Sequence, residues 1–284
     1  MGVAQVDTND LAAYVSAELS RVKGVLAVVL GGSRARGDAH PDSDIDLGIY
    51  YDPAHPPALD DLRALAVRLD DRGSGDVVTH FGEWGPWING GGWLDIQGQR
   101  VDWLYRDYAL VRQVIDECRA GNARVYYQAG HPHGFWTAIY MGEVHLCKPL
   151  ADPQGQLADL KSLTDPYPSA LKTFMIERNL WEAQFAIDTS RKAASRGDVM
   201  YVSGGLFRCA ACLVQVLFAL NERYCINEKG AVRLAASFPI CPPDFEPTIT
   251  LALGHIGTQS AELKDSIAQV EGLVISIRTL ASDL

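Results

Sequence analysis

The chain has 284 residues, of which 48% are apolar and 21% are charged, and its net charge is −10. These values are typical of a globular protein with room for two domains, and they exclude a largely disordered chain. The acidic balance argues against a broad nucleic-acid-binding surface, which would need a basic stripe.

Residues 1–10 contain no basic segment followed by an apolar core, so the sequence predicts no signal peptide. The six scattered cysteines are then expected to be reduced, which favours a cytoplasmic protein. Cys209 and Cys212 lie in an apolar helical pattern and are interpreted as core residues rather than a metal or redox pair. No apolar run is expected to approach membrane-spanning length.

The amino-terminal half alternates short apolar runs with amphipathic stretches, which indicates a mixed α/β arrangement. The spacing of apolar residues and the positions of capping and turn residues set the expected element boundaries. Helices are predicted at 11–23, 58–72 and 106–119, and strands at 25–30, 44–50, 77–81, 99–105 and 143–150.

Two glycines, Gly31 and Gly32, follow the first predicted strand and precede Ser33. Paired glycines let the backbone turn sharply and approach a ligand closely. Ser33 stands where a helix could begin, and the free N–H groups of a helix start favour phosphate. Gly32 and Ser33 are therefore candidate nucleotide-binding residues.

Arg34 and Arg36 come directly after Ser33 and could contact the same phosphates. The sequence leaves an alternative open, because either arginine could instead pair with Asp38 or Asp42. Both arginines are kept as candidate nucleotide-binding residues.

Asp44 and Asp46 lead into the next apolar run. Residues two apart in a strand point to the same face, so the two carboxylates are expected side by side. Oxygen ligands in this arrangement suit a hard cation, most naturally Mg²⁺ with phosphate as a co-ligand.

The order of strand, Gly-Gly-Ser, Asp-x-Asp and strand resembles the signature of the polymerase β-type nucleotidyltransferase superfamily. The resemblance implies metal-binding and catalytic roles for Asp44 and Asp46, and a third carboxylate on a later strand. Asp102 is the candidate, because an acid inside a strand is costly unless it is paired or bound to metal. Asp95 and Asp76 are rivals that lie nearer glycine-rich breaks, where acids are ordinary turn residues.

Trp84, Trp87 and Trp93 lie in a glycine-rich segment that is predicted to be a loop. They could stack on a substrate ring, but packing against the protein itself is slightly favoured for each one. His131 and His133 flank a proline, and a turn is favoured over a metal site there.

Beyond the proline-rich boundary at 165–168, the pattern becomes helical throughout. Helices are predicted at 169–195, 200–224, 228–237, 249–255 and 258–283. The expected fold class is thus α+β, a mixed sheet with flanking helices in a nucleotidyltransferase fold at 1–160, followed by an all-α helical bundle at 161–284. This layout resembles aminoglycoside nucleotidyltransferases, including kanamycin nucleotidyltransferases, and bacterial minimal-nucleotidyltransferase proteins with a fused helical partner.

The resemblance implies that the bundle completes the cleft and supplies a basic residue and a tyrosine to the nucleotide. Lys192 and Tyr201 are the candidates, with Lys229 as a further basic residue. The sequence alone favours a solvated helix face for each of them.

The implied activity is that of an Mg²⁺-dependent transferase with two metal ions bound by Asp44, Asp46 and Asp102. It would move a nucleoside monophosphate, expected to be AMP from ATP, although another nucleoside triphosphate is open. The expected acceptor is a hydroxyl of a small, cationic molecule such as an aminoglycoside-like antibiotic, and pyrophosphate is released. The alternatives are a protein-modifying, antitoxin-like nucleotidyltransferase and a non-catalytic nucleotide-binding module, although intact Ser33, Asp44 and Asp46 count against the latter.

Overall fold

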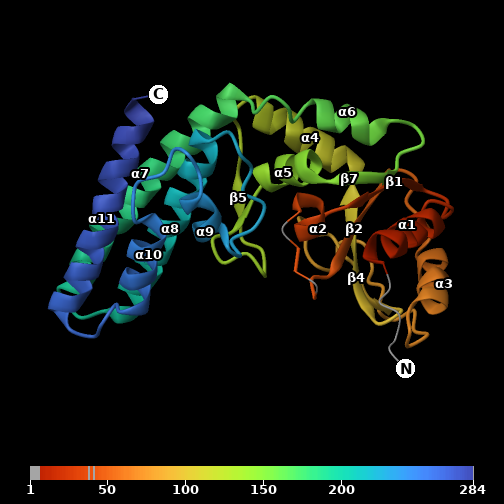
Figure 1. Cartoon of the computed structure of the whole chain (residues 1–284), viewed down its shortest axis with the longest axis horizontal. Coiled ribbons are helices and arrows are strands. Elements are labelled where there is room, and N and C mark those ends of the chain that lie inside the picture. The colour runs from red at the N-terminus through yellow and green to blue at the C-terminus, as the bar shows by residue number, and fades with distance from the viewer. Residues whose placement is uncertain (1–6, 38, 41, 284) are drawn as a thin grey trace. The chain divides into compact units, whose positions relative to one another are not determined.

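The computed structural model describes residues 7–37, 39–40 and 42–283, and these form two compact units (Figure 1). The first, called the sheet unit here, contains the described residues up to Asp116 together with Tyr140–Pro166. The second, the helical unit, contains Glu117–Ile139 and the described residues from Tyr167 onward. A mixed sheet with flanking helices followed by a helical region confirms the predicted fold class.

A five-stranded mixed sheet with the order β3-β4-β2-β1-β7 forms the centre of the sheet unit. β2 pairs with β1 in antiparallel and with β4 in parallel orientation, while β3 and β7 extend the sheet as antiparallel edge strands. β2 therefore lies in the middle of the sheet. The strands are β1 (Val25–Leu30), β2 (Ile45–Tyr51), β3 (Gly91–Ile96), β4 (Gln99–Asp107) and β7 (Lys148–Ala151).

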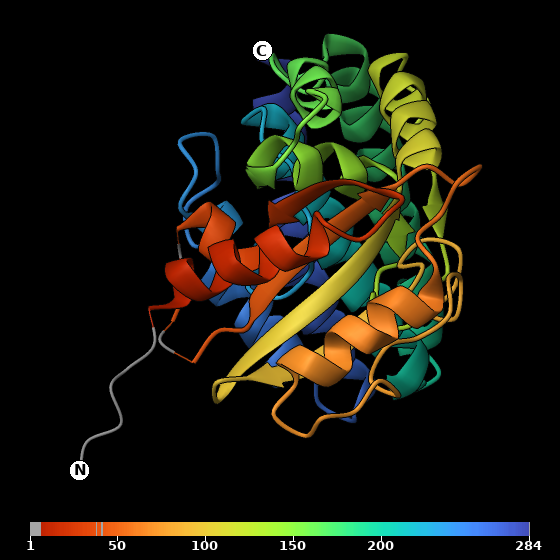
Figure 2. The ribbon, with the colours of Figure 1, turned by 90° about the vertical axis from the view of Figure 1, so that its right-hand side faces the viewer.

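Two helices, α1 (Thr8–Leu19) and α3 (Leu59–Leu69), cover one face of this sheet (Figure 2). Alternate residues of the central strands, such as Ile45, Leu47 and Trp103, are fully buried against them. Because side chains alternate along a strand, the residues between these point to the opposite face. The other helices before the bundle are α2 (Gly32–Arg36), α4 (Tyr108–Arg119), α5 (Ala138–Leu146) and α6 (Gln156–Ser162).

The helical unit is built on two long helices, α7 (Ser169–Ala194) and α8 (Val199–Leu220), which pack along each other. α11 (Ser260–Ser282) packs on both of them, and α10 (Phe245–Gly254) packs on α11. The short helix α9 (Ala231–Ala236) and a hairpin of β5 (Val125–Tyr126) and β6 (Phe135–Trp136) complete the unit.

Within the described residues, one helix is long and apolar enough to cross a membrane, and this is α8. The expectation that no apolar run reaches that length was therefore wrong. In its most apolar stretch 67% of the residues are buried inside the fold, which is typical of a core helix. Cys209 and Cys212 on this helix are fully buried, as the core interpretation predicts.

Three local predictions were wrong in the sheet unit. The segment predicted as a strand at 143–150 is helix α5 up to Leu146, and only its end forms β7. The segment 77–81 is no named strand, because Val78 makes a single bridge to Gly92. That bridge partner belongs to β3, which lies in the stretch that was predicted to be a tryptophan-rich loop.

Candidate active site

The structure brings together the three carboxylates that the sequence singles out. Asp46 on β2 lies directly beside Asp102 on β4 in the parallel register, and Asp44 immediately precedes β2. Ile45, Leu47 and Trp103, their strand neighbours, are fully buried on the other face. The apolar alternation of β2 and β4 therefore turns the carboxylates toward the face that α1 and α3 leave uncovered.

Burial and like charges both act on Asp102 in this cluster. Burial, and then the neighbouring charges of Asp46 and Asp44, together raise the pKa of Asp102 to about 6. Arg100 opposes the shift, and its Nη1 lies 3.9 Å from Asp44 Oδ1. Three carboxylates gathered at one place offer the oxygen ligands that a divalent cation prefers.

The glycine-rich turn lies against Asp46. The backbone N–H of Gly31 donates to the carbonyl oxygen of Asp46 at 2.8 Å. Gly32 has a φ of 58°, and a Cβ atom built there would lie 1.8 Å from Asp46 Oδ2. Only glycine fits a backbone so close to a carboxylate. Gly32 therefore sets the position of the carboxylate as well as the turn.

Helix α2 begins at Gly32 and places Ser33 in its first turn, as predicted, but it is only five residues long. It ends at Gly37, whose N–H donates to the carbonyl oxygen of Ser33 at 2.9 Å. The role of Ser33 toward a phosphate stays a prediction.

Arg34 binds the segment that leads into Asp44. Its Nη2 and Nε donate to the carbonyl oxygens of Ser43 at 2.5 Å and Asp44 at 3.1 Å, and its Nη1 donates to Thr8 Oγ1 at 3.0 Å. These bonds fix the backbone of the Asp-x-Asp segment. Arg36 is exposed on α2, and Asp38, one of the alternative partners, lies outside the described residues.

The two rival acids do not join the carboxylate cluster. Asp95 lies on β3 opposite Arg100, and its carboxylate is 3.6 Å from Arg72 Nη1. Asp76 is exposed in the turn that follows α3. Of the three candidates, Asp102 is the one that the sheet register places beside Asp46.

Lys192 and Tyr201 both belong to the helical unit. Lys192 is exposed in the last turn of α7, and Tyr201 lies half-exposed in the first turn of α8. Their contribution to nucleotide binding stays a prediction.

The sequence reasoning missed one basic residue next to the glycine turn. Lys148 begins β7 opposite Leu30 of β1, and its Nζ donates to the carbonyl oxygen of Arg34 at 3.3 Å. It is exposed, so it adds a positive charge beside α2. Its position depends on the pairing of β7 with β1. No local sequence pattern predicts a pairing between strands more than a hundred residues apart.

Two of the tryptophans pack on each other. The rings of Trp84 and Trp93 stack at 4.5 Å, and that of Trp87 lies 6.3 Å from the ring of Tyr140. Trp93 remains 60% exposed in this pair, so whether these rings serve a substrate stays a prediction.

A second group of metal-ligating side chains lies in the helical unit, where atoms of His133, Glu182 and Cys212 lie within 4.8 Å of one another. Glu182 is paired there with Arg178 and Arg208. Two guanidinium groups already neutralise the only carboxylate of the group, so we assign no metal to it.

Comparison with known proteins finds similarity for two segments of the chain. Residues 14–75 match a family model described as a nucleotidyltransferase domain, and residues 140–229 match a domain of unknown function (DUF4037). No curated protein matches the chain. A solved structure of a nucleotidyltransferase-like protein from Exiguobacterium sibiricum is 11% identical with a TM-score of 0.48, over 94% of this chain and 75% of that one. The segment 14–75 is thus similar to a nucleotidyltransferase domain, and the chain continues into a helical region.

Proposed function

We propose that the protein transfers a nucleoside monophosphate, AMP from ATP, onto a hydroxyl group of a small molecule and releases pyrophosphate. The observation that carries the proposal is the carboxylate cluster. Asp46 and Asp102 are register partners on adjacent strands, and Asp44 lies two residues before Asp46. The nucleotidyltransferase domain match spans Gly32, Ser33, Asp44 and Asp46, and the sheet register adds Asp102.

The cluster is suited to two Mg²⁺ ions, with Asp44, Asp46 and Asp102 as their protein ligands. When bound, the metal supplies positive charge to the phosphates and lowers the pKa of the acceptor hydroxyl. The acceptor oxygen forms a bond to the α-phosphorus while the bond to the departing pyrophosphate breaks, and the hydroxyl proton passes to solvent water. The chain contributes rigidity, because β2 and β4 hold the carboxylates before substrate arrives.

Basic groups near the turn favour a polyphosphate substrate. Lys148 and Arg100 flank the cluster, at the carbonyl of Arg34 and the carboxylate of Asp44 respectively. This distribution of charge supports binding of a nucleoside triphosphate with its metal.

The net charge of −10 supports a cationic acceptor over RNA. We therefore propose an aminoglycoside-like hydroxylated amine as the acceptor class, and antibiotic resistance as the corresponding biological role. A protein acceptor is the alternative outcome of the test.

The acceptor is tested by incubating the protein with ATP, GTP, CTP or UTP and Mg²⁺, and with a panel of aminoglycosides or with RNA. We expect pyrophosphate release that depends on an aminoglycoside, and a labelled small product. The Asp46→Asn variant serves as the inactive control. A parallel incubation contains a mixture of proteins in place of the aminoglycosides. Nucleotide addition to RNA ends or to a protein, with no small product, would contradict the proposed acceptor.

A further inference from the structure

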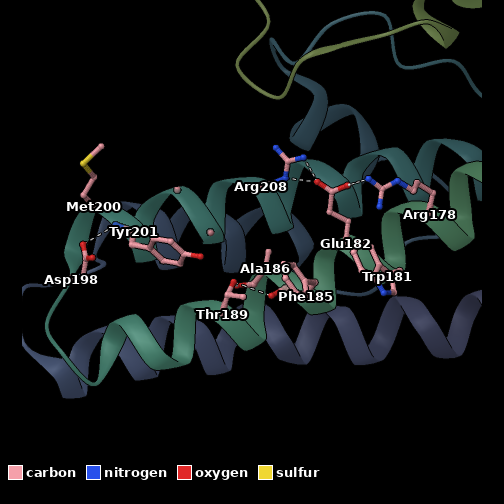
Figure 3. A pocket seen from close by; sticks show the side chains of 12 residues that line it. Arg178, Trp181, Glu182, Phe185, Ala186, Thr189, Asp198, Met200, Tyr201 and Arg208 are labelled. Atoms are coloured by element: carbon pink, nitrogen blue, oxygen red, sulfur yellow. Dashed lines mark hydrogen bonds and ion pairs between the residues drawn. The ribbon is translucent and has the colours of Figure 1, made fainter. Parts of the chain in front are cut away.

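The helical unit contains a pocket of about 570 Å³ between α7 and α8 (Figure 3). Two glycines of α8 shape it. A Cβ atom at Gly205 would lie 2.0 Å from Ser190 Oγ, so this glycine lets the two helices approach closely. A Cβ at Gly204 would meet no described atom within 4 Å, and this glycine leaves the pocket open.

Aromatic side chains form one wall of the pocket. Trp181 and Phe185, one turn apart on α7, stack with an interplanar angle of 9° and a centroid distance of 5.3 Å. Their exposed fractions are 58% and 54%, and Met200 and Tyr201 at the start of α8 are also exposed. Exposed apolar side chains gathered at one hollow are typical of a binding site, and the outer face of a stacked pair offers a flat surface for a further ring.

The other end of the pocket carries an excess of positive charge. Glu182 is buried between Arg178 and Arg208, so two guanidinium groups face one carboxylate (Figure 3). Burial lowers the pKa of the adjoining His133 to about 4, so its neutral ring adds no charge at pH 7. The net charge of Arg178, Glu182 and Arg208 is therefore +1, whereas Asp198 brings a negative charge to the part of the pocket where α8 begins.

One of these cations lies at the aromatic wall. The guanidinium carbon of Arg178 is 5.2 Å from the centroid of the Trp181 ring. The side chains of Arg178 and Arg208 remain 38% and 49% exposed, although both contact Glu182. Because a guanidinium has five donors, each arginine retains donors for a ligand.

We propose that this pocket binds a small planar aromatic molecule that carries one carboxylate or phosphate group. The ring stacks on the outer face of the Trp181–Phe185 pair, and the anionic group pairs with Arg178 and Arg208. The lining residues come from α7 and α8 and exclude the carboxylate cluster, so the inference goes beyond the proposed nucleotidyl transfer. A nucleoside monophosphate and an aromatic carboxylic acid share this chemistry.

Calorimetry in EDTA, with no divalent cation, tests the proposal with two pairs of probes. AMP is compared with adenosine, and 2-naphthoate with 2-naphthalenemethanol. We expect at least one anionic probe to bind roughly tenfold more tightly than its uncharged partner, as close charge pairing predicts. The anion that binds distinguishes the nucleotide from the aromatic acid.

Two charge variants give opposite expectations. Arg178→Gln reduces the net charge of the group to zero and should weaken anion binding by roughly tenfold, whereas Glu182→Gln raises it to +2 and should strengthen binding severalfold. Trp181→Ala should weaken both members of a probe pair, because it removes the stacking surface.

Arg191→Gln is the matched control, because Arg191 lies on α7 and pairs with Asp188 and Glu271 outside the pocket. It should leave binding unchanged, and so should Asp46→Asn, which separates this site from the proposed transfer activity. Circular dichroism shows whether each variant is folded. No anionic binding by the folded wild type, or equal binding by Arg178→Gln and Arg191→Gln, would overturn the proposal.

Discussion

The Asp102→Asn variant is expected to lose roughly a hundredfold or more in turnover, a loss comparable to that of other preorganised electrostatic groups. The substitution keeps the shape of the side chain and removes one negative charge from the cluster. Asp44 and Asp46 remain to hold the nucleotide-bound metal, so nucleotide affinity should fall less than turnover. Pyrophosphate release and nucleotide titration on one preparation measure both effects.

The same variant should gain stability when no metal is present. The pKa of Asp102 is about 6 in the folded protein, above its ordinary value of 3.8, so the folded state binds more protons between these pH values. The contribution of this group to the free energy of unfolding therefore falls as the pH rises from about 4 to about 6. Above that window Asp102 is ionised, and the protein remains destabilised by its charge. Asn cannot ionise, so the variant should melt at a higher temperature than the wild type at pH 7 in EDTA.

Asp95→Asn is the matched control, because Asp95 lies on the adjacent strand β3 and pairs with Arg72 away from the cluster. It should retain turnover. If Asp102→Asn instead melts early without metal and turns over normally, Asp102 is a structural residue and the third carboxylate must be sought elsewhere.

Replacement of Gly32 by alanine should reduce turnover by a similar factor for a different reason. The new Cβ would lie 1.8 Å from Asp46 Oδ2, so the carboxylate or the turn must move. A misplacement of about 1 Å at a reacting centre can cost on the order of a hundredfold in rate. The positive φ of 58° adds strain of about 1 kcal/mol, which thermal unfolding would detect.

The Gly37→Ala variant separates the effect of backbone strain from the effect of displacing the Asp46 carboxylate. Gly37 ends the same short helix with a φ of 87°, and a Cβ there would meet no described atom within 4 Å. This variant should lose a similar amount of stability and keep its turnover. Equal activity of the two alanine variants would show that the contact between Gly32 and Asp46 does not matter for the reaction.

The parts of the site that are close in sequence were predictable. Strand β1, the glycine turn and the Asp-x-Asp segment lie within about 25 residues, and period-two alternation placed Asp102 on the polar face of β4. The register that puts Asp102 beside Asp46 could be suspected only from the superfamily resemblance, because parallel pairing of β2 with β4 is a long-range contact.

The spacing of apolar residues gave the wrong element where it fits a helix and a strand equally well. In 138–146 nearly every apolar position is buried, so neither helical nor strand periodicity stands out, and Glu143 and His145 imitate an alternating strand. Glu143 in fact pairs with the buried Arg106 at 2.7 Å. The segment 117–139 packs with the helical residues, and composition carries no signal for such a contact.

Calorimetry of nucleoside triphosphate binding with and without Mg²⁺ tests the carboxylate cluster most directly. The wild type should bind at least one of ATP, GTP, CTP and UTP in the presence of Mg²⁺, and much more weakly in EDTA. The Asp44→Asn and Asp46→Asn variants should lose the metal-dependent part of the affinity, because each lacks one of the charges that hold the cation. A folded wild type that binds none of the four nucleotides with Mg²⁺, or that binds them equally well in EDTA, would contradict the account.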